Sequence, residues 1–487
     1  MNRFCLLMRN ILPIMLVALL VPIATIANTE DGVRLYKQGK TDEAIASLTQ
    51  TAKSDPKDAT CRRWLGFMLL SQQKYSDALA ALKEARALNS DGSDLRFNLG
   101  IAYLQTGDAK AAASEFQEAI KQRKDWAEAY YWLGNSYLKL QDAQAAVGEF
   151  NKAAALSPND ANIHNNLGLA LGEMGKADQG IAELRKATGL APQNADFWIN
   201  LGIALNDKKN IRDAQSAFEK ASAADPQNYT ARTGLAGILA AQGEDEKALA
   251  QYEAAAKIKP DEFIPQYNLG VLYLKKNSFL GSTEAFRKAA KANPDDVETI
   301  AYFGWALFKA GKVDEGIAKM SEATGKNPKF APAWQNLATA YTTLNKNTEA
   351  AKAWEGLLAA DPNNAGAALN LGYIYLTEGN NEKALEAYET AAKIDPKSGS
   401  AYFGIGSTLA KMNKSDEAIE QYKKAISLSP KFSPAYNNLG VELEKKGQVD
   451  QAKEQYRKAL RIDPKNEEAI KNLERFGEKP GLENPGA

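Results

Sequence analysis

The residues with the clearest chemistry are seven asparagines that recur at one position of an internal spacing of 34 residues. They are Asn98, Asn166, Asn200, Asn268, Asn336, Asn370 and Asn438. Each side chain offers two hydrogen-bond donors and one acceptor. A row of such amides predicts a surface that holds the backbone of a peptide without demanding a particular sequence. The alternative is that the amides belong to the scaffold and bond to a neighbouring helix.

Aromatic side chains form two further groups of candidate binding residues. One group is Trp64, Phe67, Phe97, Tyr131 and Trp132, and the other is Tyr267, Tyr302, Trp305, Phe308 and Tyr373. Aromatic rings supply large contact areas and anchor binding sites. Trp132, Tyr302 and Trp305 therefore join the seven asparagines as candidate ligand-binding residues. Packing between helices is the alternative for each of them, since aromatic residues in helices are mostly core.

The sequence offers few candidate catalytic residues. His164 is the only histidine, and no cysteine or acidic constellation accompanies it. Such a residue forms neither a metal site nor a nucleophilic triad by itself. The sequence also lacks a phosphate-binding loop of the GxxxxGK[ST] kind and a dinucleotide fingerprint. We expect no enzyme activity, no cofactor and no metal.

A repeat of 34 residues positions all these side chains. A shift by that length aligns one column of glycines, with alanine at positions 236 and 338: Gly32, Gly66, Gly100, Gly134, Gly168, Gly202, Gly270, Gly304, Gly372, Gly406 and Gly440. The register continues without insertion through thirteen copies, from about residue 25 to 466. An unbroken repeat of this length predicts a stacked array instead of a single compact core.

Two further columns indicate paired helices. Small residues follow the glycine column by twelve positions, as at Ala112, Ala146 and Gly180. Large apolar residues follow four positions later, as at Phe116 and Phe150. A spacing of four places side chains on one helical face, and small residues let two helices pack closely.

Turn residues separate the helices. Glycine or asparagine, which tolerate a left-handed backbone, stands between the two helices of most copies: Gly39, Gly107, Gly175, Gly243, Asn277, Gly311, Asn345, Gly379, Asn413 and Gly447. Asp178, Asp314, Asp416 and Asp450 follow and are expected to cap the second helix. That helix ends before a proline in most copies, as at Asp55-Pro56 and Asp463-Pro464. Each copy is therefore two short helices, stabilised mainly by neighbouring copies.

These columns resemble the tetratricopeptide repeat family, most clearly from Ala435 to Gly440, followed by Ala452, Tyr456, Ala459 and Pro464. The resemblance covers about 90% of the chain. It implies an all-α, right-handed superhelical solenoid whose first helices line a concave groove that binds protein or peptide partners. The asparagine column is similar to the ladder in the arm of O-linked N-acetylglucosamine transferases. No segment is left here for their catalytic domain.

The first 27 residues have the layout of a secretory signal peptide. Arg3 and Arg9 precede an apolar run from Ile11 to Ile26, and Thr25-Ile26-Ala27 predicts cleavage after Ala27. We expect a periplasmic or extracellular protein. The alternative is an uncleaved anchor helix with the repeats outside the cytoplasm, although the run is shorter than the roughly 20 residues a span needs. In that case the leader would be the only membrane contact.

The charge balance argues against nucleic acid as a partner. The chain has 60 basic and 60 acidic residues, and removal of Arg3 and Arg9 leaves 58 against 60, a net charge of −2. Such a chain has no general attraction for phosphate backbones. Cleavage would also leave Cys61 as the one cysteine, so that no intramolecular disulfide could form.

The sequence thus predicts four segments: a signal peptide at 1–27, the repeat array at 28–466, a capping helix at 467–476 and a disordered tail at 477–487. The function we expect is an exported scaffold that binds protein or peptide partners in envelope assembly, secretion or polysaccharide export. A carbohydrate-binding envelope protein that uses the same groove is the alternative, because sugars also favour aromatic and amide side chains. The sequence leaves open whether the chain forms a homo-oligomer.

Overall fold

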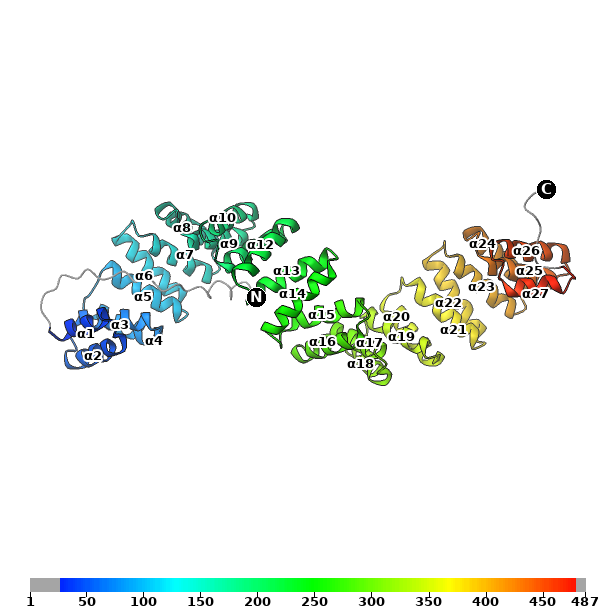
Figure 1. Cartoon of the computed structure of the whole chain (residues 1–487), viewed down its shortest axis with the longest axis horizontal. Helices are drawn as coiled ribbons and strands as arrows, with labels where there is room; N and C mark the ends of the chain where they lie inside the picture. Colours follow the sequence, from blue (N-terminus) through cyan, green and yellow to red (C-terminus); the bar gives the residue numbers. More distant parts are fainter. Residues whose placement is uncertain (1–26, 479–487) are drawn as a thin grey trace. The chain divides into compact units, whose positions relative to one another are not determined.

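The computed structural model describes residues 27–478, and every regular element in that range is an α-helix. The helices follow one another in pairs joined by short turns (Figure 1). They form two compact units, one ending at Lys259 and the other beginning at Pro260. No helix of the described range is long and apolar enough to span a bilayer.

Unit 1 contains seven helix pairs within the described residues. They are α1 (Ala27–Lys37), α2 (Thr41–Ser54), α3 (Ala59–Ser71), α4 (Tyr75–Ala87), α5 (Ser93–Gln105), α6 (Ala109–Gln122), α7 (Ala127–Lys139), α8 (Ala143–Leu156), α9 (Ala161–Glu173), α10 (Ala177–Leu190), α11 (Ala195–Asp207), α12 (Ile211–Ala224), α13 (Tyr229–Ala241) and α14 (Asp245–Ile258).

Unit 2 contains six helix pairs and one further helix within the described residues. They are α15 (Phe263–Lys275), α16 (Phe279–Ala292), α17 (Val297–Lys309), α18 (Val313–Lys326), α19 (Ala331–Thr343), α20 (Asn347–Ala360), α21 (Ala365–Thr377), α22 (Asn381–Ile394), α23 (Gly399–Lys411), α24 (Ser415–Leu428), α25 (Ser433–Lys445), α26 (Val449–Ile462) and α27 (Glu467–Glu474).

The two helices of a pair touch through the small-residue columns. A Cβ atom built on Gly168 would lie 2.8 Å from the carbonyl oxygen of Gly180, and one built on Gly180 would lie 2.6 Å from that of Gly168. A Cβ on Gly100 would lie 2.6 Å from the ring of Phe116, which is fully buried. The close helix pairing expected from these columns is confirmed, and side chains larger than glycine at Gly168 would force the backbones apart.

The turns between paired helices adopt the left-handed backbone that the sequence predicts. All ten glycines and asparagines named for these turns have a positive φ, as at Gly175 (76°) and Asn345 (55°). Gln73, Gln141 and Lys209 fill the same turn with φ values of 57°, 61° and 59°. Glutamine and lysine do not favour a positive φ, so the sequence did not predict a left-handed backbone at these positions. The helix pairing of the repeat imposes the turn there.

The capping role assigned to the four aspartates was wrong. Asp178 lies in the first turn of α10, and Lys176 occupies the cap position without a side-chain hydrogen bond. Asp314, Asp416 and Asp450 likewise lie in the first turns of their helices. An acidic side chain there still interacts favourably with the positive end of the helix.

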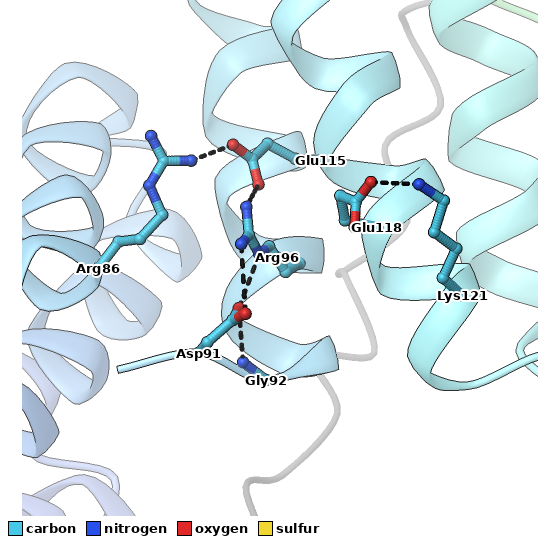
Figure 2. Close-up of polar contacts among 7 residues, drawn as sticks. All are labelled: Arg86, Asp91, Gly92, Arg96, Glu115, Glu118 and Lys121. Atoms are coloured by element: carbon cyan, nitrogen blue, oxygen red, sulfur yellow. Dashed lines mark hydrogen bonds and ion pairs between the residues drawn. The ribbon is translucent and has the colours of Figure 1, made fainter. Parts of the chain in front are cut away.

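An ion-pair network replaces the usual proline turn between α4 and α5 (Figure 2). The carboxylate of Glu115, a buried residue of α6, pairs with Arg86 at the end of α4 and with Arg96 of α5, the latter at 2.9 Å. Arg96 also bonds to Asp91 at 2.7 Å. This hydrogen bond lowers the pKa of Asp91. Charge pairing therefore joins three helices where Ser90 stands in place of the usual proline.

The all-α repeat fold is confirmed within each unit. The helix expected at the C-terminal end is α27, whose Leu473 is buried against the last pair. Glu478, which follows it, pairs with Arg457 at 2.7 Å. The proposed signal peptide lies outside the described residues except for Ala27, and so does the proposed tail after Glu478.

Candidate functional site

The first helices of successive pairs share one face in each unit. In unit 1, α7 contacts α9 and α9 contacts α11, and in unit 2, α15 contacts α17 and α17 contacts α19. No contact of similar extent joins successive second helices in the described range. The first helices are thus more closely spaced and lie on the inside of each unit. We call the surface they form there the inner face.

The asparagines of unit 1 bond to one another across three first helices. Asn200 of α11 donates through Nδ2 to Oδ1 of Asn165 at 2.9 Å. Asn165 donates to Oδ1 of Asn166 at 3.0 Å. Asn166 donates to Oδ1 of Asn135 at 2.8 Å and to the hydroxyl of Tyr131 at 3.1 Å. Of the candidate asparagines, Asn166 and Asn200 are therefore engaged in a side-chain network inside the protein.

The same arrangement returns at the C-terminal end of unit 2. Asn472 of α27 donates to Oδ1 of Asn437 at 2.9 Å, and Asn437 donates to Oδ1 of Asn438 at 3.2 Å. The spacing of 35 residues between Asn437 and Asn472 equals that between Asn165 and Asn200. Asn472 also stands 34 residues after Asn438, where the next repeat would have its asparagine. The helix α27 therefore packs as the first helix of another repeat would.

The remaining candidate asparagines differ in their bonding. Asn268 and Asn370 donate to the carbonyl four residues earlier on their own helices, at 2.8 and 3.0 Å. Asn98 is buried. The Nδ2 atom of Asn336 on α19 is buried, and no acceptor for it occurs among the described residues.

Two glycines show which way the asparagine column faces. Gly234 and Gly404 occupy this column, and Cβ atoms built there would lie 2.5 Å from the Phe218 ring and 2.4 Å from the Tyr388 ring. Both rings belong to the second helix of the preceding pair. The column therefore faces the seam between repeats, where amides can bond across the seam.

The first aromatic group is mainly core. Phe67 and Phe97 are buried, and Phe97 stacks on Trp126 with ring centroids 4.4 Å apart. Trp64 packs edge-on against Phe67. Trp132 is half-buried and meets Tyr131 edge-on at 5.4 Å. Burial raises the pKa of Tyr131 to about 12.

The second aromatic group combines packing with exposure. Tyr302 is half-buried and stacks on Phe286 of the preceding pair. Trp305 stacks on Phe308, with ring centroids 5.6 Å apart, and both pack partly against the core around Met320. Tyr373 is 61% exposed.

The structure adds two exposed apolar residues that the sequence reasoning missed. Ile264 and Val271 of α15 are 51% and 37% exposed. Val271, Trp305 and Tyr373 each stand directly after the glycine column, on α15, α17 and α21. The column is also apolar in unit 1, where Phe67 and Ile101 are buried, so the residue type at this position gave no usable signal for exposure. Val271, Trp305 and Tyr373 bring apolar surface to the inner face of unit 2.

His164 is a structural residue of α9. Its Nε2 lies 2.8 Å from the carbonyl oxygen of Pro158, and its Nδ1 lies 2.6 Å from the Glu183 carboxylate. In five other copies the equivalent side chain donates to the equivalent carbonyl: Trp198, Arg232, Gln266, Trp334 and Tyr436. In the described range, no group of three or more histidine, cysteine or acidic residues could hold a metal ion.

Glu128 of α7 is an ionisable residue that the sequence reasoning did not select. Burial raises the pKa of its carboxyl to about 7, while hydrogen bonds with Trp132 and Trp126 act in the opposite direction.

No curated protein matches the chain. Among solved structures, it is similar to YrrB, described as a TPR protein with an unusual peptide-binding site. The identity is 24% over 39% of this chain and 99% of that one, with a TM-score of 0.36. The Pseudomonas aeruginosa protein pilF is 21% identical over 42% of this chain and 94% of its own, with a TM-score of 0.39. MamA is 24% identical over 34% of this chain and 96% of its own, with a TM-score of 0.32.

Family models described as tetratricopeptide repeat match most of the chain. One model matches residues 31–93, 68–126, 97–161, 165–211, 303–354 and 335–399. Others match 433–466, 236–277, 406–447, 195–228 and 265–296. The first model alone covers more than half of the sequence. The chain therefore belongs to the tetratricopeptide repeat family.

Proposed function

We propose that this protein is an exported scaffold that binds a protein or peptide partner on the inner face of unit 2, without catalysing a reaction. The observation that carries the proposal is the exposure of Ile264, Val271 and Tyr373 on first helices of that unit. Ile264 and Val271 lie together on α15, and Tyr373 lies on α21 of the same unit. Exposed apolar side chains that gather on one face mark binding surfaces more often than single exposed residues do. Tetratricopeptide arrays commonly bind protein or peptide partners.

The inner face of unit 1 fits this role less well. Its asparagines bond to one another, so a ligand would have to replace the bonds of Asn165, Asn166 and Asn200. Replacing a satisfied hydrogen bond yields little net free energy. We therefore do not propose that the asparagines of unit 1 hold the backbone of a peptide.

Site-specific photo-crosslinking tests the binding site. A benzophenone amino acid at position 373, in the protein expressed in its source cell, should give an adduct with one defined partner. The same amino acid at position 280 is a matched control, because Leu280 is 74% exposed but lies on the second helix α16. An adduct of equal yield at both positions, or none at 373, would contradict the proposed site.

Export is the cellular part of the proposal, and the Arg3–Ala27 segment of the sequence supports it. A role in envelope assembly, secretion or polysaccharide export would follow from such a location. Cell fractionation with N-terminal sequencing tests it, with a mature chain that begins at Asn28 as the expected result. An intact chain found only in the cytosol would refute the export proposal.

A further inference from the structure

A cavity opens on the side of unit 1 opposite its inner face, between the second helices α10 and α12. Its volume is about 350 Å³, and the first helix α11 forms its floor with Trp198, Leu201 and Leu205. Leu201 and Leu205 are buried, whereas Trp198 is half-buried. A volume of this size lies at the lower end of the range for small-molecule sites. We call this space the outer cavity.

The outer cavity arises where an alanine replaces a glutamate of the repeat. Ala217 lines the cavity from α12 and stands 34 residues after Glu183. The Glu183 carboxylate reaches His164, the residue equivalent to Trp198, with Oε2 2.6 Å from Nδ1. An alanine side chain is too short to reach Trp198 in this way, so the space beside the indole ring stays open. Gly189 on the opposite wall adds no side chain, and a Cβ built there would meet nothing within 4 Å.

The same alanine leaves a lysine without the carboxylate that it has in the two preceding copies. Lys152 pairs with Glu149 at 2.8 Å, and Lys186 pairs with Glu183 at 2.8 Å, with the glutamate three residues earlier on each helix. Lys220 is the equivalent lysine of the next copy, but the residue three positions before it is alanine. Its ammonium group lies 4.4 Å from the centroid of the indole ring in the cavity and forms no ion pair among the described residues.

The other charged side chains that line the outer cavity are paired. Asp213 of α12 accepts a hydrogen bond of 2.7 Å from Arg185 of α10, and this ion pair links the two helices. In an adjoining space that shares Arg185 with the outer cavity, Asp178 pairs with Lys208 at 3.0 Å. Lys220 therefore carries the unbalanced charge, and a ligand with one negative group complements it.

We propose that the outer cavity binds a small organic carboxylate with an apolar body. The carboxylate of the ligand takes the place of the glutamate that this copy lacks, and it pairs with Lys220. The apolar body covers Trp198, Leu201 and Leu205. This inference goes beyond the proposed function and is independent of it, because it concerns unit 1 alone.

Two probes of nearly equal shape test whether the ligand must carry a negative charge. Phenylpropanoate has the carboxylate, and phenylpropanamide has a neutral amide in its place. Titrations of the chain from residue 28 to 487, followed by ligand-detected NMR, should give a dissociation constant of about 1 mM or lower for the acid. The acid should bind at least fivefold more tightly than the amide. Equal affinities would overturn the carboxylate ligand, and no binding of the acid would overturn the site.

Two substitutions test whether the acid binds in the outer cavity. Ala217→Glu supplies the missing carboxylate from the protein itself, so the variant should stay folded and bind the acid at least tenfold more weakly. Lys220→Gln removes the cation, so it should weaken binding of the acid at least fivefold and leave binding of the amide unchanged. Parent-like affinity for the acid in either folded variant would overturn the proposed site.

A matched control separates loss of the site from a general loss of positive charge. Lys186→Gln removes the equivalent lysine of the preceding copy, where Glu183 already supplies the carboxylate. This variant should bind the acid as the parent does, and thermal unfolding should show all three variants folded. If Lys186→Gln weakened binding as much as Lys220→Gln, overall charge would explain the affinity and the inference would be wrong.

Discussion

The amide of Asn200 donates to the side-chain oxygen of Asn165 at 2.9 Å, and this bond joins the first helices α11 and α9 of unit 1. Asn472 and Asn437 make the equivalent bond at the same length between α27 and α25. Both bonds span 35 residues, one more than the repeat. Asparagine at these two columns therefore stabilises the seam between neighbouring repeats.

Asn165→Ala should destabilise unit 1. The substitution leaves the buried Nδ2 of Asn200 and the Oδ1 of Asn166 without their bonds, which costs about 1–3 kcal/mol. Urea unfolding of the full chain, with hydrogen exchange to localise the change, measures the loss. Asn370→Ala is the matched control, because Asn370 bonds only to the Gly366 carbonyl of its own helix among the bonds that we observe. Its effect should stay within about 0.5 kcal/mol, and an equal effect of both variants would contradict the seam role.

Glu128→Gln should change how stability depends on pH. Burial raises the pKa of Glu128 from 4.5 to about 7, so the folded chain binds the proton more tightly than the unfolded chain does. The contribution of this group to stability is thus full below pH 4.5 and is lost as the pH rises to 7. The variant should gain stability over the parent at pH 8, by at most about 3 kcal/mol. Urea midpoints of both proteins at pH 5 and pH 8 give the comparison, and a difference that does not vary with pH would refute it.

Gln141→Gly should stabilise the turn between α7 and α8. Gln141 has a φ of 61°, which costs a side chain with a Cβ about 1 kcal/mol, whereas glycine adopts it freely. We expect a gain of about 0.5 kcal/mol after the greater flexibility of glycine in the unfolded chain is counted. Leu140→Gly is the control, since the φ of Leu140 is −82° and the substitution should destabilise the protein. Thermal unfolding of both variants measures these changes in stability. A lower stability of Gln141→Gly than of the parent would contradict the prediction.

Glu115→Ala should weaken the junction between the second and third helix pairs. Its buried carboxylate pairs with both Arg86 and Arg96 (Figure 2), and removal of a shared partner leaves two guanidinium groups close together. Because both arginines are partly exposed, we expect a loss of about 2 kcal/mol, below the usual range for fully buried pairs. Hydrogen exchange of α4 and α5 reports the change, and Glu118→Ala serves as the control because Glu118 pairs only with the exposed Lys121 among the pairs that we observe. If α4 and α5 exchanged their amide hydrogens at the same rate in both variants, the result would contradict a stabilising role of the Glu115 ion pairs.

The repeat fold was predictable because its causes are local. Glycine at position 168 and at 180, large residues four positions later and left-handed turn residues each constrain a single helix pair, and the pattern returns in every copy. The exceptions are equally local. Gln141 and Lys209 take the left-handed turn because the pairs on either side require it, which residue preference alone does not reveal.

The candidate site was less predictable because exposure depends on the neighbouring repeats. Phe67 and Tyr373 occupy the same column, yet Phe67 is 3% exposed and Tyr373 is 61% exposed. Phe67 is surrounded by Tyr36 and Trp64, which come from other positions of the repeat. The asparagine column was found by residue type. Whether these side chains point toward the neighbouring repeat depends on how each helix is rotated about its axis, since successive residues are about 100° apart around a helix. The residue type does not fix that rotation.

The central claim is that the asparagine network stabilises the array and that the inner face of unit 2 binds the ligand. The most direct measurement compares Asn165→Ala and Tyr373→Ala for two properties, the free energy of unfolding and the dissociation constant for the partner crosslinked at position 373. We predict that Asn165→Ala loses stability and keeps its affinity, whereas Tyr373→Ala keeps its stability and binds at least tenfold more weakly. Weaker binding by a folded Asn165→Ala variant, together with unchanged binding by Tyr373→Ala, would contradict the claim and return the ligand to the asparagine ladder.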